Sequence, residues 1–260
     1  MKEECHGPDR HACPDRRASR RFAGGLARNA PEFLKREKEF SRFGDALAAE
    51  RRALPWVRVE KDYDFDGADG QRSLSDLFEG RSQLFVYHFM YGPGWQEGCK
   101  SCSYVADHFD GATDHLAARD VTLVTVSRAP FGEITPFKRR MGWRFPWFSS
   151  SGSDFNYDFG VAFTRDEVEG DDPVYNYGSE VPPIEDLHGA SVFFKDASDM
   201  IYHTYSTYGR GLDQVMNTYN FLDMMPKGRD EVGLGFTMDW VRHHDQYEHV
   251  LRAGAACCGG

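Results

Sequence analysis

Residues 84–102, LFVYHFMYGPGWQEGCKSC, contain the pattern that decides the fold. The first eight of these residues, 84–91, are apolar almost throughout, which is typical of a central strand buried on both faces. A Gly- and Pro-containing loop over residues 92–98 then leads to Cys99 and Cys102. Apolar residues recur at helical spacing after the first cysteine, as far as residue 118. The sequence therefore predicts a C-x-x-C motif where a buried strand, a loop and a helix meet.

The downstream segments predict an α/β fold. Residues 121–126 (VTLVTV) form a second buried strand in this interpretation, and a helix follows around residues 133–141. A hairpin is expected from residues 191–195 and 200–205, before a last helix over residues 212–225. Strands that alternate with helices favour parallel pairing by right-handed crossovers, and the hairpin adds antiparallel strands. We predict a thioredoxin-like fold, with a central mixed sheet flanked by helices.

The N-terminal part predicts additions to this core. Residues 1–30 are polar and Arg-rich and are expected to be disordered. A helix over residues 32–53 is expected to pack on the domain. Alternating apolar residues between 57 and 65, followed by the turn Asp-Gly-Ala-Asp-Gly at 66–70, predict an extra strand or hairpin.

The expected domain boundaries follow from these segments. The thioredoxin-like domain, including the N-terminal helix, is predicted over residues 31–252. Residues 168–188 are acidic and contain Gly and Pro, which favours a loop insertion on the surface. Residues 253–260 are predicted to form a flexible tail that carries Cys257 and Cys258.

The composition limits the function classes. Of 260 residues, 40% are hydrophobic and 28% charged, as in globular proteins. The net charge of −10 argues against nucleic acid as a partner, because proteins that bind phosphate backbones carry basic surfaces. No apolar run approaches the roughly 20 residues of a membrane helix. The polar N-terminus lacks a signal peptide's apolar centre, so the cytoplasm is the expected compartment.

The spacing of Cys99 and Cys102 predicts redox chemistry. A cysteine at a helix start lies beside unpaired backbone N–H groups that favour the thiolate, and Lys100 adds a positive charge. Cys99 would attack, and Cys102, one turn further and less exposed, would resolve the mixed disulfide. A C-x-x-C motif near a βαβ pattern in a cytosolic chain is a recognised redox signature.

A metal site is the alternative interpretation of the same pair. Tetrahedral zinc usually needs four ligands, and the sequence has no second C-x-x-C motif. His243, His244 and His249 lie far downstream. A thioredoxin-like module that binds a soft metal such as Cu(I) or Zn stays open as a rival. No organic cofactor is expected, since the sequence has neither a G-x-G-x-x-G after a strand nor a P-loop.

Several long blocks of the chain resemble a known family. These blocks are RRALPWVRVEKDYDFDG (51–67), LFVYHFMYGPGW with GCKSCS (84–103), VSRAPF (126–131), FKRRMGWRFPWFSSSGSDFNYDFGV (137–161) and YHTYSTYGRGLD (202–213). They resemble a bacterial thioredoxin-like family catalogued as domain of unknown function 899 and described as predicted dithiol–disulfide oxidoreductases. The resemblance extends from about residue 32 to the C-terminus, and it implies the fold and a class of chemistry.

The motif departs from two related groups. Thioredoxin has Trp directly before its first cysteine, whereas this chain has Gly98, with Trp95 further back. The opening hairpin and the segment VSRAPF also resemble peroxiredoxins. That group needs Thr three residues before its peroxidatic cysteine, and Gln96 stands there. A thiol peroxidase is therefore disfavoured but kept as an alternative.

Four further groups are weaker candidates. His88, in the strand before the Cys loop, could donate a proton near the dithiol, although a hydrogen-bonded core histidine is the commoner case. Asp107 or His108 could serve as acid–base for Cys102, against an exposed pair on the helix face. Arg128 follows a strand end and could hold an anion or peroxide, or simply form a salt bridge. Core packing is expected of the aromatic cluster Trp143, Phe145, Trp147 and Phe148, and a rim around the dithiol is the other interpretation.

These observations lead to one prediction. The chain is expected to be a thiol–disulfide oxidoreductase in which Cys99 attacks and Cys102 resolves. Its expected substrate is a thiol or disulfide, in a protein or a small molecule, and another thiol system would supply electrons. Cys257 and Cys258 could shuttle those electrons, although two uninvolved thiols on a flexible end are the more ordinary interpretation.

Overall fold

The structure is a computed structural model that describes residues 16–248, with side chains from residue 29 onward. The chain divides into two compact units between Leu54 and Pro55. The predicted tail at 253–260, with Cys257 and Cys258, lies outside the described residues, as do Cys5 and Cys13.

The first unit contains one long helix, α1 (Arg16–Arg52). The helix begins before Glu32, so residues 16–30, which the sequence predicts as disordered, are helical. Pro31 lies inside α1, although proline lacks the N–H that a helix interior uses. The helix lies in a compact unit of its own. The domain bounds expected from the sequence, residues 31–252, stay a prediction.

Over residues 55–248, which the structure describes, the second unit is built on one sheet of eight strands in the order β1-β8-β7-β4-β5-β6-β2-β3. Neighbours pair in parallel at β4–β5 and β5–β6, and all other neighbouring pairs are antiparallel. The strands are β1 (Val57–Arg58), β2 (Asp64–Gly67), β3 (Gly70–Ser73), β4 (Gln83–His88), β5 (Val121–Ser127), β6 (Trp147–Ser149), β7 (Gly189–Lys195) and β8 (Ile201–Tyr208).

Short helices connect and cover these strands. No helix in the part of the chain that the structure describes is both long and apolar enough to cross a bilayer. The helices of the second unit are α2 (Lys100–Ala106), α3 (Thr113–Ala117), α4 (Phe131–Arg140), α5 (Phe155–Asp158), α6 (Arg165–Glu169) and α7 (Asn217–Asp223), with 3-10 turns η1 (Asp76–Phe78), η2 (Gly209–Val215) and η3 (His244–Gln246).

The strand order confirms the predicted thioredoxin-like fold. The parallel pair β4–β5 is joined through α2 and α3, and the hairpin β7–β8 lies antiparallel beside β4. The order β8-β7-β4-β5, with the dithiol segment directly after the central strand β4, is the thioredoxin-like arrangement. The β2–β3 hairpin, which the turn at 66–70 predicts, adds two strands at one edge.

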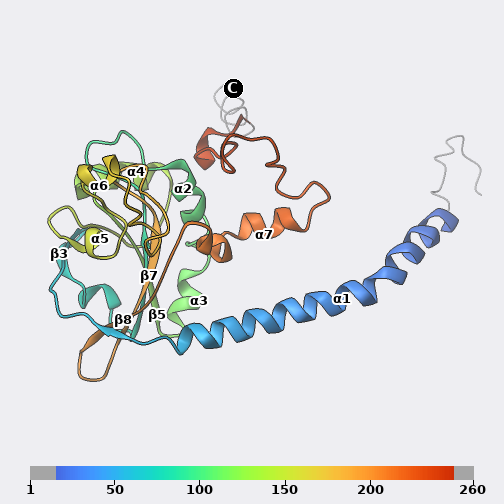
Figure 1. Cartoon of the computed structure of the whole chain (residues 1–260), viewed down its shortest axis with the longest axis horizontal. Helices are drawn as coiled ribbons and strands as arrows, with labels where there is room; N and C mark the ends of the chain where they lie inside the picture. The colour runs from blue at the N-terminus through green and yellow to red at the C-terminus, as the bar shows by residue number, and fades with distance from the viewer. Residues whose placement is uncertain (1–15, 249–260) are drawn as a thin grey trace, which may run out of the picture. The chain divides into compact units, whose positions relative to one another are not determined.

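The two faces of the sheet carry separate cores. Figure 1 shows α2, α3 and α7 on one side of β5 and β7, and α5 and β3 on the other. Because side chains alternate along a strand, Tyr87 of β4 joins the core beneath α2, and Val86 and His88 point to the opposite face. The face beneath α2 also contains Cys102, and we call it the dithiol face.

Several predicted elements differ from the structure. The helix expected over residues 99–118 is two helices, α2 and α3, because the chain turns between them. The Asp110 carboxylate fixes this turn by accepting from the backbone N–H of Arg144 (3.0 Å) and Phe145 (2.9 Å). The helix expected over residues 212–225 is likewise divided at Met216 into η2 and α7.

Two regions contain more structure than the sequence predicts. Trp147–Ser149 forms β6, which joins β5 to β2. The acidic segment 168–188 is not wholly a surface loop, because Tyr175, Asp186 and Leu187 are buried. Asp186 forms an isolated bridge with Ala162 that ties the end of this segment to the domain.

Candidate active site

The two cysteines of the C-x-x-C motif lie where the Cys loop, residues 89–98, meets α2. The backbone N–H of Cys99 donates to the carbonyl of Met90 at 3.0 Å. The carbonyl of Cys99 accepts from the N–H and the hydroxyl of Ser103, both at 2.9 Å. Cys99 immediately precedes α2 and is half-buried, whereas Cys102 is only 2% exposed. Both cysteines are free thiols. The thiol of Cys99 is partly accessible, whereas that of Cys102 is covered.

The surroundings separate the acidities of the two thiols. A hydrogen bond from the Cys102 thiol is the largest cause that lowers the pKa of Cys99, which falls to about 6. The backbone N–H groups of Cys102 and Ser101 act in the same direction, against the effect of burial. For Cys102, burial is the largest cause and raises the pKa well above the ordinary value of 9.0, and Cys99 adds to this rise. Cys99 is therefore the more acidic and the more exposed thiol of the pair.

Lys100 and Trp95 are close to the dithiol but play lesser roles in this geometry. The largest contributions to the lowered pKa of Cys99 come from Cys102 and Ser101 rather than from the ammonium group of Lys100. The partly buried Trp95 packs against the dithiol-face core, and its backbone N–H donates to the carbonyl of Gly92 at 3.2 Å. It shapes the turn that opens the Cys loop.

Close packing explains why glycine precedes Cys99. A Cβ atom at Gly98 would lie 2.6 Å from Cε1 of Phe89 and 2.7 Å from Cε1 of Phe137. Contacts this short are not tolerated in a packed core, so a larger residue would displace the loop. The missing tryptophan of thioredoxin thus follows from the two rings that hold Gly98 against the core.

A segment from the end of the described chain covers the Cys loop. This C-terminal segment, residues 241–247, is anchored by Val241, which is fully buried, and by His243, which is 4% exposed. The Nε2–H of His243 donates to the carbonyl of Gly98 at 2.9 Å. Gly98, the residue directly before Cys99, is therefore held by a residue 145 positions later in the sequence.

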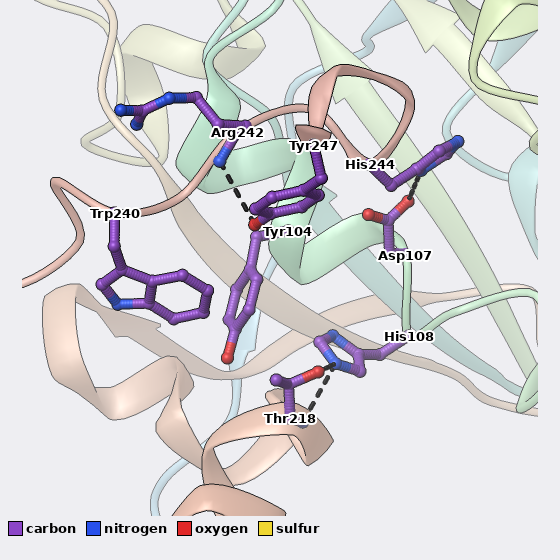
Figure 2. Close-up of a pocket in the computed structure, with 8 residues that line it drawn as sticks. All are labelled: Tyr104, Asp107, His108, Thr218, Trp240, Arg242, His244 and Tyr247. Atoms are coloured by element: carbon purple, nitrogen blue, oxygen red, sulfur yellow. Dashed lines mark hydrogen bonds and ion pairs between the residues drawn. The ribbon is translucent and has the colours of Figure 1, made fainter. Parts of the chain in front are cut away.

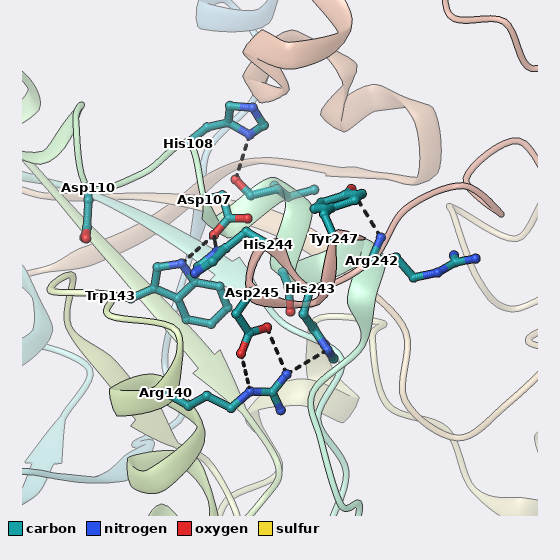
Figure 3. Close-up of polar contacts among 12 residues, drawn as sticks. Asp107, His108, Asp110, Arg140, Trp143, Arg242, His243, His244, Asp245 and Tyr247 are labelled. Atoms are coloured by element: carbon teal, nitrogen blue, oxygen red, sulfur yellow. Dashed lines mark hydrogen bonds and ion pairs between the residues drawn. The ribbon is translucent and has the colours of Figure 1, made fainter. Parts of the chain in front are cut away.

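Arg140 of α4 ties the C-terminal segment to the Cys loop. Figure 3 shows its guanidinium beside Asp245 and His243. Its guanidinium donates to the carboxylate of Asp245 at 2.7 Å and 3.1 Å, and it also pairs with Glu97. The Nη2 atom of Arg140 lies 3.4 Å from Nδ1 of His243. Hydrogen bonds to Asp245 and Glu97 raise the pKa of Arg140, so the guanidinium stays charged and connects α4, the loop and the segment.

A cavity of about 380 Å³ lies beside α2, and Figure 2 shows its walls. Asp107, a predicted acid–base for Cys102, lines this cavity. Its carboxylate accepts from Nε1 of Trp143 at 2.8 Å and pairs with Nδ1 of His244 at 2.7 Å. Five residues turn a helix by about 500°, so Asp107 leaves α2 on a different side from Cys102. The lining residues are Tyr104, Asp107, His108, Thr218, Trp240, Arg242, His244 and Tyr247.

The structure places His88 on the face of the sheet opposite the dithiol. Its Nε2 forms a 2.8 Å hydrogen bond with the Ser191 hydroxyl, and its ring lies near Phe155 and Phe159. Complete burial, with a smaller effect of His203, lowers its pKa to about 3. His88 is therefore a neutral core histidine and not a proton donor to the cysteines.

Arg128 forms a salt bridge, which is the simpler of the two interpretations of its position. Its Nε and Nη2 donate to the two carboxylate oxygens of Asp186, each at 2.7 Å. The side chain of Arg128 is 14% exposed and that of Asp186 is 6% exposed. The guanidinium also lies over the ring of Tyr157 at 5.1 Å. Because its Nε and Nη2 both donate to Asp186, Arg128 links the end of β5 to the acidic segment 168–188.

The aromatic cluster after α4 is part of the core. Trp143, Phe145 and Trp147 are between 2% and 7% exposed, and Phe148 is half-buried on the other face. Nε1 of Trp147 donates to the Ser127 hydroxyl at 3.0 Å. The packing interpretation is confirmed for the three buried rings.

Sequence reasoning did not identify Tyr87 or His243 as site residues. Tyr87 lies within an apolar run, where a tyrosine cannot be distinguished from any other core residue. The sequence presents His243 only as a possible metal ligand, because its pairing with the Cys loop depends on the tertiary fold. Among the residues whose side chains the structure describes, no three His, Cys, Asp or Glu side chains converge as a metal-binding group.

The contact between the thiols predicts a distinctive pH profile. Replacing Cys102 with alanine removes the largest cause of the lowered pKa, so the pKa of Cys99 should rise from about 6 toward the ordinary 9.0. At pH 6 half of the native Cys99 is ionised, against about 0.1% for a thiol of pKa 9. A less basic thiolate is also less nucleophilic, by roughly 20-fold for this difference. Cys99 alkylation should be up to about 20-fold slower in the variant at pH 6 and faster at pH 10.

The measurement is iodoacetamide labelling followed by mass spectrometry of the peptide that contains Cys99, which separates it from the other cysteines. The native and Cys102→Ala rates should cross between about pH 7 and pH 8. Two parallel profiles would show that Cys102 does not set the acidity of Cys99.

Comparisons with known proteins give one family match and several similar solved structures. A family model described as "Bacterial protein of unknown function (DUF899)" matches residues 26–247. No curated protein matches the chain. Similar solved structures include peroxidoxin BcpB from Mycobacterium tuberculosis, with 15% identity, a TM-score of 0.43, and coverage of 64% of this chain and 95% of that one.

Two other solved structures are similar at the same level. A cysteine-to-serine mutant of PrxQ from Xylella fastidiosa has 14% identity and a TM-score of 0.40, with 61% of this chain and 88% of that chain covered. A putative thiol:disulfide interchange protein DsbE from Chlorobium tepidum has 14% identity and a TM-score of 0.39, with 64% and 97% covered.

Proposed function

The chain belongs to the bacterial DUF899 family of proteins of unknown function, and from its dithiol we propose that it is a thiol–disulfide oxidoreductase. One observation carries the proposal: the two sulfurs of the C-x-x-C motif are unequal. The half-buried Cys99 has a pKa lowered to about 6 by its contact with Cys102 and nearby N–H groups, and Cys102 is covered and much less acidic. Dithiol exchange needs this division between an attacking and a resolving thiol.

The first step is attack by the Cys99 thiolate on a substrate disulfide. Its sulfur bonds to one substrate sulfur while the substrate S–S bond breaks, and the second substrate sulfur leaves with the electron pair and takes up a proton. At pH 7 about nine-tenths of a thiol of pKa 6 is ionised, so the attacking form predominates near neutrality.

The second step is attack by Cys102 on the Cys99 sulfur of the mixed disulfide. The Cys99–Cys102 bond forms, the bond to the substrate breaks, and the released substrate sulfur takes the proton that Cys102 gives up. The substrate has then gained two electrons, and the protein holds a disulfide that an external thiol system must reduce. Cys102 is close enough to hydrogen-bond Cys99, so intramolecular attack needs little rearrangement.

The proposal predicts a reversible redox transition. The native protein is equilibrated in glutathione buffers, its thiols are alkylated, and the peptide carrying both cysteines is analysed by mass. We expect one two-electron transition between about −300 and −120 mV. A potential near about −270 mV would indicate a reductant, and one above about −180 mV an oxidant or isomerase.

Other outcomes would oppose the proposal. Cysteines that stay reduced at every glutathione ratio would overturn it. Zinc or copper that remains at one equivalent after desalting would favour the metal-binding alternative. Rapid peroxide consumption without disulfide reduction would favour a peroxidase, although Gln96 occupies the position of the expected threonine.

A further inference from the structure

A tyrosine beneath the dithiol has no role in the fold that explains its hydroxyl group. Tyr87 of β4 is fully buried on the dithiol face, and its ring makes edge contacts with Phe109 (5.2 Å) and Phe89 (6.1 Å) between centroids. The hydroxyl makes no regular hydrogen bond in the structure. Phenylalanine could make the same ring contacts without burying an unsatisfied polar group, which destabilises a folded protein.

The Tyr87 hydroxyl and the Cys102 thiol are both buried in the core of the dithiol face, where they interact. Their interaction favours the ionised form of the thiol and opposes the effect of burial on the Cys102 pKa. The hydroxyl itself is buried and beside the thiols, which raises its pKa well above 10. It therefore keeps its proton during exchange and can act only as a hydrogen-bond donor toward a thiolate.

A second donor meets the same sulfur. The backbone N–H of Met90, at the start of the Cys loop, donates to Sγ of Cys102 at 3.4 Å. A covered thiolate lacks water to stabilise it, so its charge depends on donors that the fold provides. The Tyr87 hydroxyl and the Met90 N–H are two such donors, supplied by the end of β4 and the first residues after it.

We propose that Tyr87 is a catalytic residue that donates a hydrogen bond to the Cys102 thiolate when that thiolate forms. This role rests on the proposed exchange activity and deepens it. In the resolving step, Cys102 gives up its proton and attacks the Cys99 sulfur, and the departing substrate sulfur takes up the electron pair and a proton. In the reverse direction, attack on Cys99 expels Cys102 as a thiolate. The hydroxyl stabilises the same charged sulfur in both directions.

The test is Tyr87→Phe, which removes one oxygen and keeps the ring. A matched control is Tyr104→Phe, because the Tyr104 hydroxyl is also buried without a regular hydrogen bond but lies on the cavity side of α2. Each protein is mixed with an activated disulfide, and formation and decay of the Cys99 mixed disulfide are followed by rapid acid quenching and mass spectrometry. Urea unfolding of both variants is measured alongside.

We expect Tyr87→Phe to slow decay of the mixed disulfide about 10- to 100-fold, the effect of one hydrogen bond to a charged group. Its formation should change less than about twofold, because that step belongs to Cys99. Tyr104→Phe should alter neither rate. The unfolding midpoint of Tyr87→Phe should not fall, since an unsatisfied group has been removed.

Two results would overturn this role. Decay at the native rate would show that the hydroxyl does not act on Cys102. Equal slowing of both steps with a lower unfolding midpoint would assign Tyr87 to packing alone. If the native protein forms no mixed disulfide, the exchange activity itself fails, an outcome that separates the two proposals.

Discussion

Serine in place of Cys99 is expected to lower disulfide reduction by at least about 10³-fold, because a hydroxyl of high pKa replaces the thiolate nucleophile. Serine in place of Cys102 should stop turnover differently. Cys99 can still attack, but no second thiol resolves the product, so a mixed disulfide accumulates to one equivalent. Reduction of insulin disulfides measures turnover, and intact-protein mass detects the trapped adduct.

Two of the four cysteines outside the C-x-x-C motif provide the control for this pair. Replacing both Cys257 and Cys258 with serine should leave turnover unchanged, because those thiols lie outside the C-x-x-C motif. If Cys99→Ser loses peroxide consumption but the native protein never reduces insulin, the chain is a peroxidase. If it loses bound metal and neither activity exists, the chain is a metal carrier.

Removing the carboxylate of Asp186 is expected to cost about 3–5 kcal/mol of unfolding free energy, the effect of breaking a buried ion pair on one side. Asp186→Ala would leave the Arg128 guanidinium, only 14% exposed, without the partner that accepts two of its N–H groups. The change also opens space beside Gly92, where a Cβ atom would lie 2.6 Å from the Asp186 carboxylate. The Cys loop should therefore loosen as well.

Urea unfolding provides the measurement, and a double variant provides the control. Replacing the pair with Arg128→Met and Asp186→Leu should recover most of the loss, because neither charge is then left buried. A single Asp186→Ala variant that loses less than about 1 kcal/mol would place the pair among exposed salt bridges. It would also contradict the anchoring of the Cys loop by this pair.

The sequence predicts the central strands of the sheet better than the short strand β6 and the ends of the helices. The strands β4, β5, β7 and β8 are continuous or alternating apolar runs, and burial on a sheet produces such runs directly. β6 was missed because three residues, Trp147–Ser149, have no period and become a strand only through their neighbours. The expected helix over 99–118 was too long because side-chain capture by Asp110 ends it early, and that contact joins residues distant in sequence.

The residues of the candidate site divide in the same way. Some are visible from their spacing in the sequence, and the place of others depends on the tertiary fold. Cys99 and Cys102 were visible because their spacing is itself the motif. Lys100 is adjacent in sequence, yet adjacency does not tell where a side chain points, and the Cys99 pKa depends mainly on Cys102 and Ser101. The favoured interpretation of His88, a hydrogen-bonded core histidine, is confirmed. The proton-donor alternative stayed open because a strand that is apolar on both sides does not indicate which face meets the dithiol. Tyr87 precedes His88 by one residue. Because successive side chains of a strand point to opposite faces, Tyr87 lies on the dithiol face.

The hydrogen bond between His243 and Gly98 has a consequence for how the protein is made. Synthesis proceeds from the N-terminus, so the Cys loop emerges 145 residues before the imidazole that holds it. Contacts between such distant residues form late, after the local elements and the sheet. The nascent chain therefore carries its reactive cysteines on a loop that is not yet braced, in a period when other thiols and disulfides can reach them. Cells that produce this protein quickly should need reducing conditions until residues 241–247 have docked.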